Sequence, residues 1–108
     1  MVLGSFYFQL TNNGNLLGEY MNNKSTRVTT ESADFIGEFH DSFIGDYQTT
    51  WFDGTGQNML LSIRLKNENR NIFRLDWRIG NIIHFVGEGF LSNDQLIGTY
   101  WDNGLMVI

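Results

Sequence analysis

Two stretches of the sequence, MLLSIRLK (59–66) and IFRLDWRI (72–79), alternate apolar with polar side chains. In the first, the odd-numbered residues from Met59 to Leu65 are apolar, and in the second those from Phe73 to Ile79 are. A period of two residues is typical of a strand with one face on a core and one in water. The turn-forming run 67–70 lies between them, so the two stretches predict a hairpin.

Short apolar runs between turn signals continue along the chain. Asn12-Asn13-Gly14-Asn15 is the clearest turn signal, because Asn and Gly tolerate the positive φ of tight hairpins. No helical stripe extends beyond about two turns. We expect strands near residues 5–11, 15–22, 34–40, 43–52, 58–66, 71–79, 81–91 and 95–102, and the segments 26–30 and 105–108 are candidates for additional short strands.

An apolar-apolar-Gly-x-aromatic pattern occurs four times, at 16–20, 35–39, 43–47 and 96–100. Glycine inside a strand lets the strand bend, or lets a neighbouring aromatic ring lie over the bare backbone. Closure of a small sheet removes its unpaired edges. We therefore predict one all-β domain over residues 1–108, a small antiparallel up-and-down β-barrel of about eight strands. A β-sandwich is the alternative.

The composition disfavours several classes of function and kinds of site. The net charge of −5 disfavours nucleic-acid binding, and no apolar run approaches a membrane span. Without cysteine there is no disulfide and no thiolate metal site. No motif indicates a metal or cofactor site, and His40 and His84 lack metal-ligand spacing. With no signal peptide evident at the N-terminus, we expect a cytoplasmic protein.

Charge is unevenly placed. Residues 64–78 hold five of the seven basic side chains and two acids, a net charge of +3 that leaves −8 for the rest. The parity of the two strands predicts that four of these bases share a polar face. Arginine binds carboxylates and phosphates well, so this face is a candidate docking site, with a solvated surface as the alternative. The residues concerned are Arg64, Lys66, Arg74 and Arg78.

The hairpin sequence from Gly4-Ser5-Phe6-Tyr7-Phe8 to Leu16-Leu17-Gly18-Glu19-Tyr20 is similar to one in avidin-like barrels. Residues 73–77, 84–88 and 96–101 resemble three later avidin strands, and Gly45-Asp46-Tyr47 is similar to the Gly-x-Trp motif of lipocalins. The chain thus resembles the calycin group, although no Gly-x-Trp strand opens it and no complete biotin site can be assembled. The resemblance implies that Tyr20, Trp77, Phe85 and Trp101 contact a ligand. Together with Tyr47 they form the predicted ligand-binding set.

A second resemblance concerns the C-terminal part. The chain length and Ile97-Gly98-Thr99 are similar to staphostatins, barrel-shaped inhibitors of cysteine proteases whose binding segment carries a Gly-Thr near the C-terminus. This resemblance implies a protein partner contacted by Gly98 and Thr99. The alternative is that Gly98 only bends its strand, because the match lies inside the chain's own repeat.

Several carboxylates accompany the strand glycines. Glu19, Glu38, Asp46 and Glu88 could act as acid–base pairs at a barrel mouth, but solvated outer-face positions are the expected interpretation, because charged groups are rarely buried unpaired.

Three functions follow from these observations. The leading hypothesis is a non-enzymatic barrel that binds a small apolar or aromatic ligand, with homo-oligomers conceivable through exposed aromatics. The second is a protein-binding inhibitor or sequestering protein. The third, a barrel cyclase or isomerase, needs a buried carboxylate or Tyr of shifted pKa beside a pocket.

Overall fold

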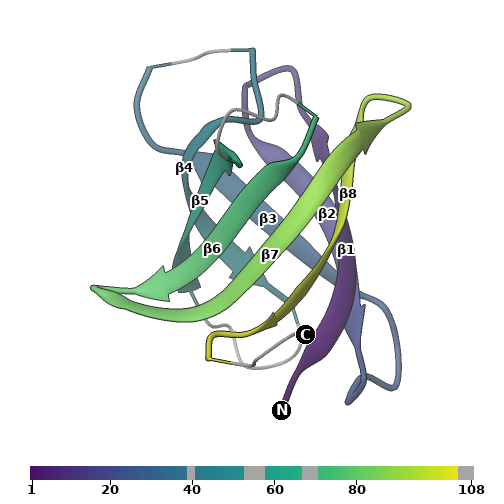
Figure 1. Cartoon of the computed structure of the whole chain (residues 1–108). Coiled ribbons are helices and arrows are strands. Elements are labelled where there is room, and N and C mark those ends of the chain that lie inside the picture. Colours follow the sequence, from purple (N-terminus) through teal and green to yellow (C-terminus); the bar gives the residue numbers. More distant parts are fainter. Residues whose placement is uncertain (39–40, 53–57, 67–70, 105–108) are drawn as a thin grey trace.

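In the computed structural model, which describes residues 1–38, 41–52, 58–66 and 71–104, the chain forms a closed eight-stranded antiparallel barrel (Figure 1). Each strand pairs with the next, and β8 pairs with β1 to close the sheet. The described residues contain no helix, and hence none long and apolar enough to cross a membrane. The strands are β1 (Leu3–Leu10), β2 (Leu16–Asn22), β3 (Thr29–Phe35), β4 (Gly45–Trp51), β5 (Asn58–Leu65), β6 (Phe73–Ile79), β7 (Ile82–Ser92) and β8 (Gln95–Asp102). The all-β up-and-down barrel predicted from sequence is therefore confirmed.

One strand lies elsewhere than predicted. The strand expected over 34–40 is wrong, because β3 spans Thr29–Phe35 and begins inside the segment 26–30. The backbone turns after it, where Gly37 has a φ of +123°. The glycine repeat at 35–39 thus marks a bend rather than a strand interior, while residues 39–40 and the tail 105–108 lie outside the described residues.

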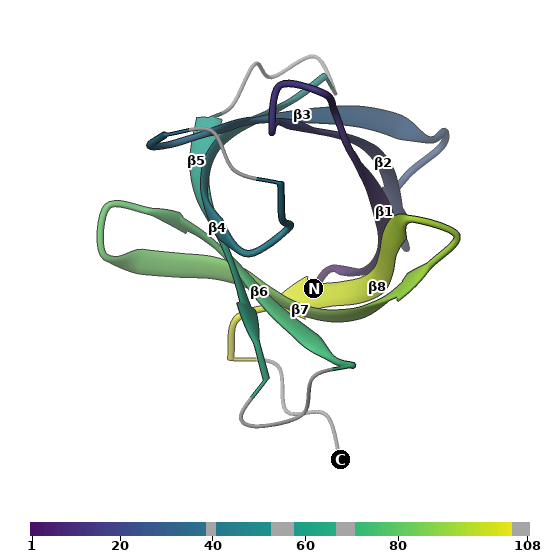
Figure 2. The same ribbon diagram turned by 90° about the horizontal axis from the view of Figure 1, so that it is seen from above.

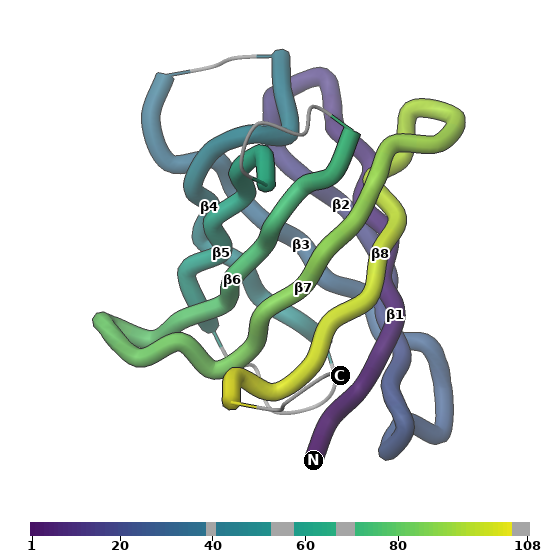
Figure 3. Tube along the Cα trace, viewed as in Figure 1, coloured from purple at the N-terminus to yellow at the C-terminus, as the bar shows by residue number. Residues whose placement is uncertain are grey.

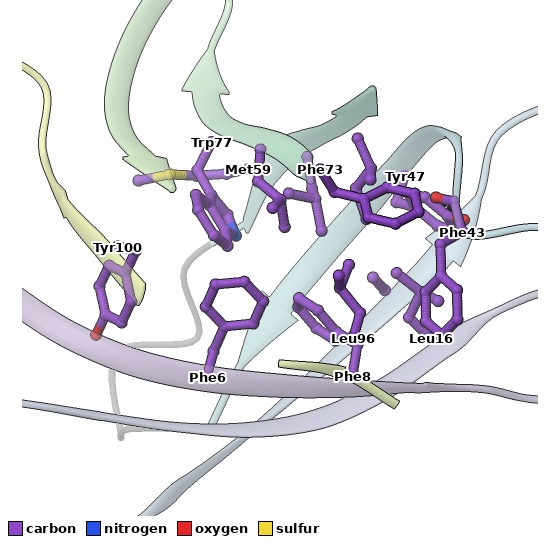
Figure 4. Close-up of a cluster of buried hydrophobic side chains, with 14 of the residues drawn as sticks. Phe6, Phe8, Leu16, Phe43, Tyr47, Met59, Phe73, Trp77, Leu96 and Tyr100 are labelled. Carbon is purple, nitrogen blue, oxygen red and sulfur yellow. Dashed lines mark hydrogen bonds between the residues drawn. The ribbon is translucent and has the colours of Figure 1, made fainter. Parts of the chain in front are cut away.

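The interior is packed at one end of the barrel. Figure 4 shows Phe8, Leu16, Phe73 and Leu96 meeting there, and Figure 2 shows the segment that precedes β4 lying across this opening. Phe43 of that segment is buried, and its carbonyl accepts a 2.9 Å hydrogen bond from the Tyr47 hydroxyl. We call this the filled end. It carries the β1–β2 and β3–β4 connections.

The opposite end carries the N-terminus and the β2–β3 and β6–β7 connections (Figure 3). Strand alternation directs the inward side chains of the chain start, of the end of β2 and of the start of β3 into this half of the lumen. The register brings Tyr20 opposite Thr29 and Glu31 opposite Trp51. We call this the cavity end.

Strand glycines allow the close packing of β1 against both neighbours. A Cβ built on Gly18 would lie 2.7 Å from the Phe8 ring, and one on Gly98 would lie 2.8 Å from the Phe6 ring. Phe8 pairs with Gly18 and Phe6 with Gly98 across the sheet. The expectation that an aromatic ring lies over a bare strand glycine is confirmed at both positions.

We predict that Gly98→Ala lowers the free energy of unfolding by about 2–4 kcal/mol, because the new methyl would lie 2.1 Å from the Glu88 carbonyl oxygen, on backbone that has no room to move. Urea denaturation measures this. Thr99→Ala, at the exposed neighbour on the outer face, is the control and should change stability by less than about 1 kcal/mol. Equal effects of the two substitutions would contradict the packing role of Gly98.

Candidate ligand-binding cavity

A cavity of about 310 Å³ occupies the cavity end of the barrel. Its wall combines side chains from strands that are distant in sequence, brought together by closure of the sheet. Val2 and Met59 contribute aliphatic surface, and Asn22 and His84 contribute polar groups. Most of the wall is aromatic, made by Phe6, Tyr20, Trp51, Trp77, Phe85 and Tyr100.

The aromatic side chains pack against one another edge to face or tilted. The centroid of the Trp77 ring lies 5.8 Å from the centroid of the Phe6 ring and 5.8 Å from that of the Tyr100 ring. Figure 4 shows the three side chains. Tyr100 also contacts the rings of Tyr20 at 6.2 Å and Phe85 at 6.0 Å. Such contacts add stability beyond area burial and hold the rings in fixed orientations. The aromatic part of the wall is therefore preorganised by contacts within the protein.

Glu31 is a carboxylic acid buried in this wall. Its side chain, on the inward face of β3, is 4% exposed. The Thr49 hydroxyl donates a 2.5 Å hydrogen bond to Oε2, and the Trp77 indole N–H donates another of 3.0 Å to the same oxygen. Within the described part of the chain, Oε1 accepts no hydrogen bond. Glu31 thus presents one satisfied and one unsatisfied carboxyl oxygen.

Burial sets the protonation of this group. Desolvation disfavours the charged form and raises the pKa of Glu31 to about 7, although the hydrogen bonds from Thr49 and Trp77 act in the opposite direction. Burial also raises the pKa of Tyr100, against a lowering contribution from its hydrogen bond with Asn22. The cavity therefore holds a carboxyl group that exchanges its proton near neutral pH.

Sequence reasoning misses Glu31. The stretch TTESADF (29–35) puts Thr29, Glu31 and Ala33 on the inward face, so it lacks the apolar alternation that marks a half-buried strand. The patterns place the strand further along the chain and assign Glu31 to no element. No signal in the sequence marks Glu31, because its inward orientation follows from its pairing with Gly18 of β2, which only the structure shows.

The predicted ligand-binding residues divide into two groups. Tyr20, Trp77 and Phe85 line the cavity. Tyr47 lies at the filled end, where its hydroxyl donates to the Phe43 carbonyl, and burial raises the pKa of Tyr47 to about 12. Trp101 follows Tyr100 on β8, so alternation directs it to the outer face. The predicted set is therefore brought together only in part.

The predicted basic face carries acids as well. Arg64 pairs with Asp46 at 2.9 Å, Lys66 with Glu88 at 2.9 Å, and Arg78 with Asp76 at 3.1 Å. These partly exposed pairs contribute little to stability, but they reduce the positive field of the surface.

The fourth base, Arg74, is exposed and lies between Arg64 on β5 and Glu88 on β7. Whether this face, or the adjoining Gly98 and Thr99, binds a partner stays a prediction.

The carboxylates singled out in the sequence occupy the surface. Asp46 and Glu88 belong to the ion pairs just described, and the Tyr7 hydroxyl donates a hydrogen bond to Glu19. Glu38 is exposed beyond the end of β3. The solvated interpretation holds for these four, and the buried carboxylate is a different one.

Comparison of the chain with known protein families, with curated proteins and with solved structures finds no match. The closed eight-stranded antiparallel barrel is compatible with a calycin-like fold.

We predict that Glu31 makes the fold less stable as pH rises. The ordinary pKa of a glutamate, which applies to the unfolded chain, is 4.5, whereas burial raises the pKa of Glu31 to about 7. The folded state therefore binds more protons between these values. The stabilisation is fully present below pH 4.5 and is lost as pH rises through 7. Between pH 5 and 8, the free energy of unfolding of the wild type should therefore fall by about 2–3 kcal/mol relative to that of Glu31→Gln.

Urea denaturation at the two pH values measures this difference. Asp34→Asn removes the same charge from the exposed face of the same strand and serves as the control. A pH-independent difference between wild type and Glu31→Gln would contradict the perturbed carboxyl.

Proposed function

We propose that this barrel binds a small apolar or aromatic molecule in the cavity lined by Tyr20, Trp77 and Tyr100. The observation that carries the proposal is the contrast between the two ends of one lumen. One end is closed by Phe43 and Tyr47, while the other keeps a cavity of about 310 Å³ among ordered aromatic rings. An eight-stranded barrel either fills its interior or holds one small ligand, as calycins do.

The volume limits the ligand. Ligand sites span roughly 300–1,000 Å³, and an engineered cavity of about 150 Å³ holds one benzene. A cavity of about 310 Å³ therefore suits a ligand of about one or two rings.

Glu31 favours a second candidate, proton-transfer chemistry of the cyclase or isomerase type. A general acid–base works best when its pKa is near the operating pH, and burial brings the pKa of Glu31 to about 7. Incubation of cell extract metabolites with wild type and Glu31→Gln, followed by mass spectrometry, tests it. A product formed by the wild type alone supports catalysis, and identical metabolite profiles argue for binding only.

We predict that Val2→Trp weakens the binding of indole, used as a neutral two-ring probe, by at least about tenfold. Val2 is a partly buried residue of the cavity wall, and the larger ring would occupy ligand space. Isothermal titration calorimetry measures the affinity. Leu3→Trp, at the exposed neighbouring position, is the matched control and should bind indole as the wild type does. Equal binding by both variants would place the indole site elsewhere.

A further inference from the structure

We infer that the ligand of this cavity carries a protonated nitrogen, as in a small aromatic amine, whose N–H donates to Oε1 of Glu31 while its ring packs against the aromatic wall. The inference rests on the proposed binding function and names the chemistry of the ligand. Two independent features of the described structure lead to it. They are the unsatisfied carboxyl oxygen and the absence of a basic partner for that carboxyl.

The first feature is that the two carboxyl oxygens of Glu31 differ in their hydrogen bonds. Thr49 and Trp77 both donate to Oε2, which fixes the carboxyl plane. Oε1 accepts no hydrogen bond from the described residues, although the side chain is 4% exposed and belongs to the cavity wall. A buried acceptor without a donor costs about 1–3 kcal/mol, more if charged. A ligand N–H reaching Oε1 would remove that penalty.

The second feature is electrostatic. Among the described residues, no Lys or Arg lines the cavity and none forms an ion pair with Glu31. A buried carboxylate is stabilised by hydrogen bonds, which Glu31 has from Thr49 and Trp77, and by an opposite charge, which no described residue supplies. A cationic ligand would supply the missing charge, whereas an anionic ligand would be repelled by it. The cavity therefore selects against carboxylates and phosphates.

The aromatic wall suits a cation as well. Ammonium groups are attracted to the faces of Trp and Tyr rings, more strongly where water is excluded. Trp51 and Trp77 are both buried in the wall, and Tyr100 stands beside Trp77 (Figure 4). The Asn22 amide donates to the Tyr100 hydroxyl at 2.9 Å, which holds that ring in place. The Glu31 carboxylate and the aromatic side chains of the wall together form the proposed recognition surface for an amine.

Such binding depends on pH. A cation binds the ionised form of Glu31, so affinity should rise as pH passes through 7. Among the described residues, the other titratable groups of the wall are Tyr20 on β2, His84 on β7 and Tyr100 on β8, while β4 and β6 contribute tryptophans. Asp102, at the end of β8, acts electrostatically on Tyr100. Since burial raises the pKa of Tyr100 above 10, it keeps its proton over this range. The effect of Glu31 is separated from that of the other groups by the variant Glu31→Gln.

The experiment compares three probes that share one ring and a short chain: phenethylamine, 2-phenylethanol and 3-phenylpropanoate. Calorimetric titration at pH 8 should show phenethylamine binding at least about tenfold more tightly than the alcohol, and the carboxylate binding most weakly. From pH 5 to 8 the amine affinity should rise roughly a hundredfold, because one proton must leave Glu31. The alcohol affinity should change far less.

Glu31→Gln keeps the shape and the acceptor for Trp77 and Thr49, so it should fold. In this variant the amine should lose its advantage over the alcohol together with its pH dependence. The control Asp34→Asn, on the outer face of the same strand, should behave as the wild type. A pH dependence that persists in Glu31→Gln would come from another group and would overturn the role of Glu31.

The two proposals fail in different ways. If the alcohol and indole bind but the amine gains nothing, the ligand class is wrong and the binding function stands. If no probe binds the wild type at millimolar concentration, the binding function itself is wrong. Equal amine binding by wild type and Glu31→Gln would also overturn the inference.

Discussion

Closure of the sheet between β1 and β8 is the constraint on which the remainder of the structure depends. β1 pairs with β2 on one side and β8 on the other, and both pairings set a glycine opposite a phenylalanine. Backbone oxygens of neighbouring strands lie where side chains of Gly18 and Gly98 would begin. With these contacts the strands have no free edge, and eight short strands fix the cross-section of the lumen.

Because the cross-section is fixed, the two ends of the barrel differ mainly in the side chains that occupy the lumen. At the filled end, large side chains and the segment before β4 occupy it, and the Tyr47 hydroxyl finds backbone carbonyls. At the cavity end the same barrel places the Glu31 carboxyl among aromatic rings. A neutral side chain at this position would lower the free energy of unfolding less than the ionised carboxyl does. Proteins break a local packing rule mostly where function requires it. Glu31 is such a departure, and the proposed function gives its burial a role.

The sequence predicted the barrel because its hairpins carry strong local signals. In β5 and β6, inward Leu61 and Trp77 alternate with outward Arg64 and Asp76, a pattern readable without any tertiary knowledge. Tyr20, Trp77 and Phe85 were predicted as ligand contacts from the resemblance to avidin-like barrels, and these three residues line the cavity. β3 was misplaced because its inward residues include Thr29 and Glu31, whose polarity hides the alternation. Its position is set by pairing with β2 and β4, which single-strand patterns do not encode.

The protonation of Glu31 links the stability of the barrel to the chemistry it can recognise. Because Thr49 and Trp77 hold Oε2 in either state, the proton of the neutral form resides on Oε1. A neutral Glu31 therefore donates a hydrogen bond, and an ionised one accepts. With the pKa of Glu31 at about 7, both forms are populated near neutral pH. In the proposed complex an amine would bind the ionised form and offset the desolvation that raises the pKa, so the group that destabilises the free barrel would stabilise the complex.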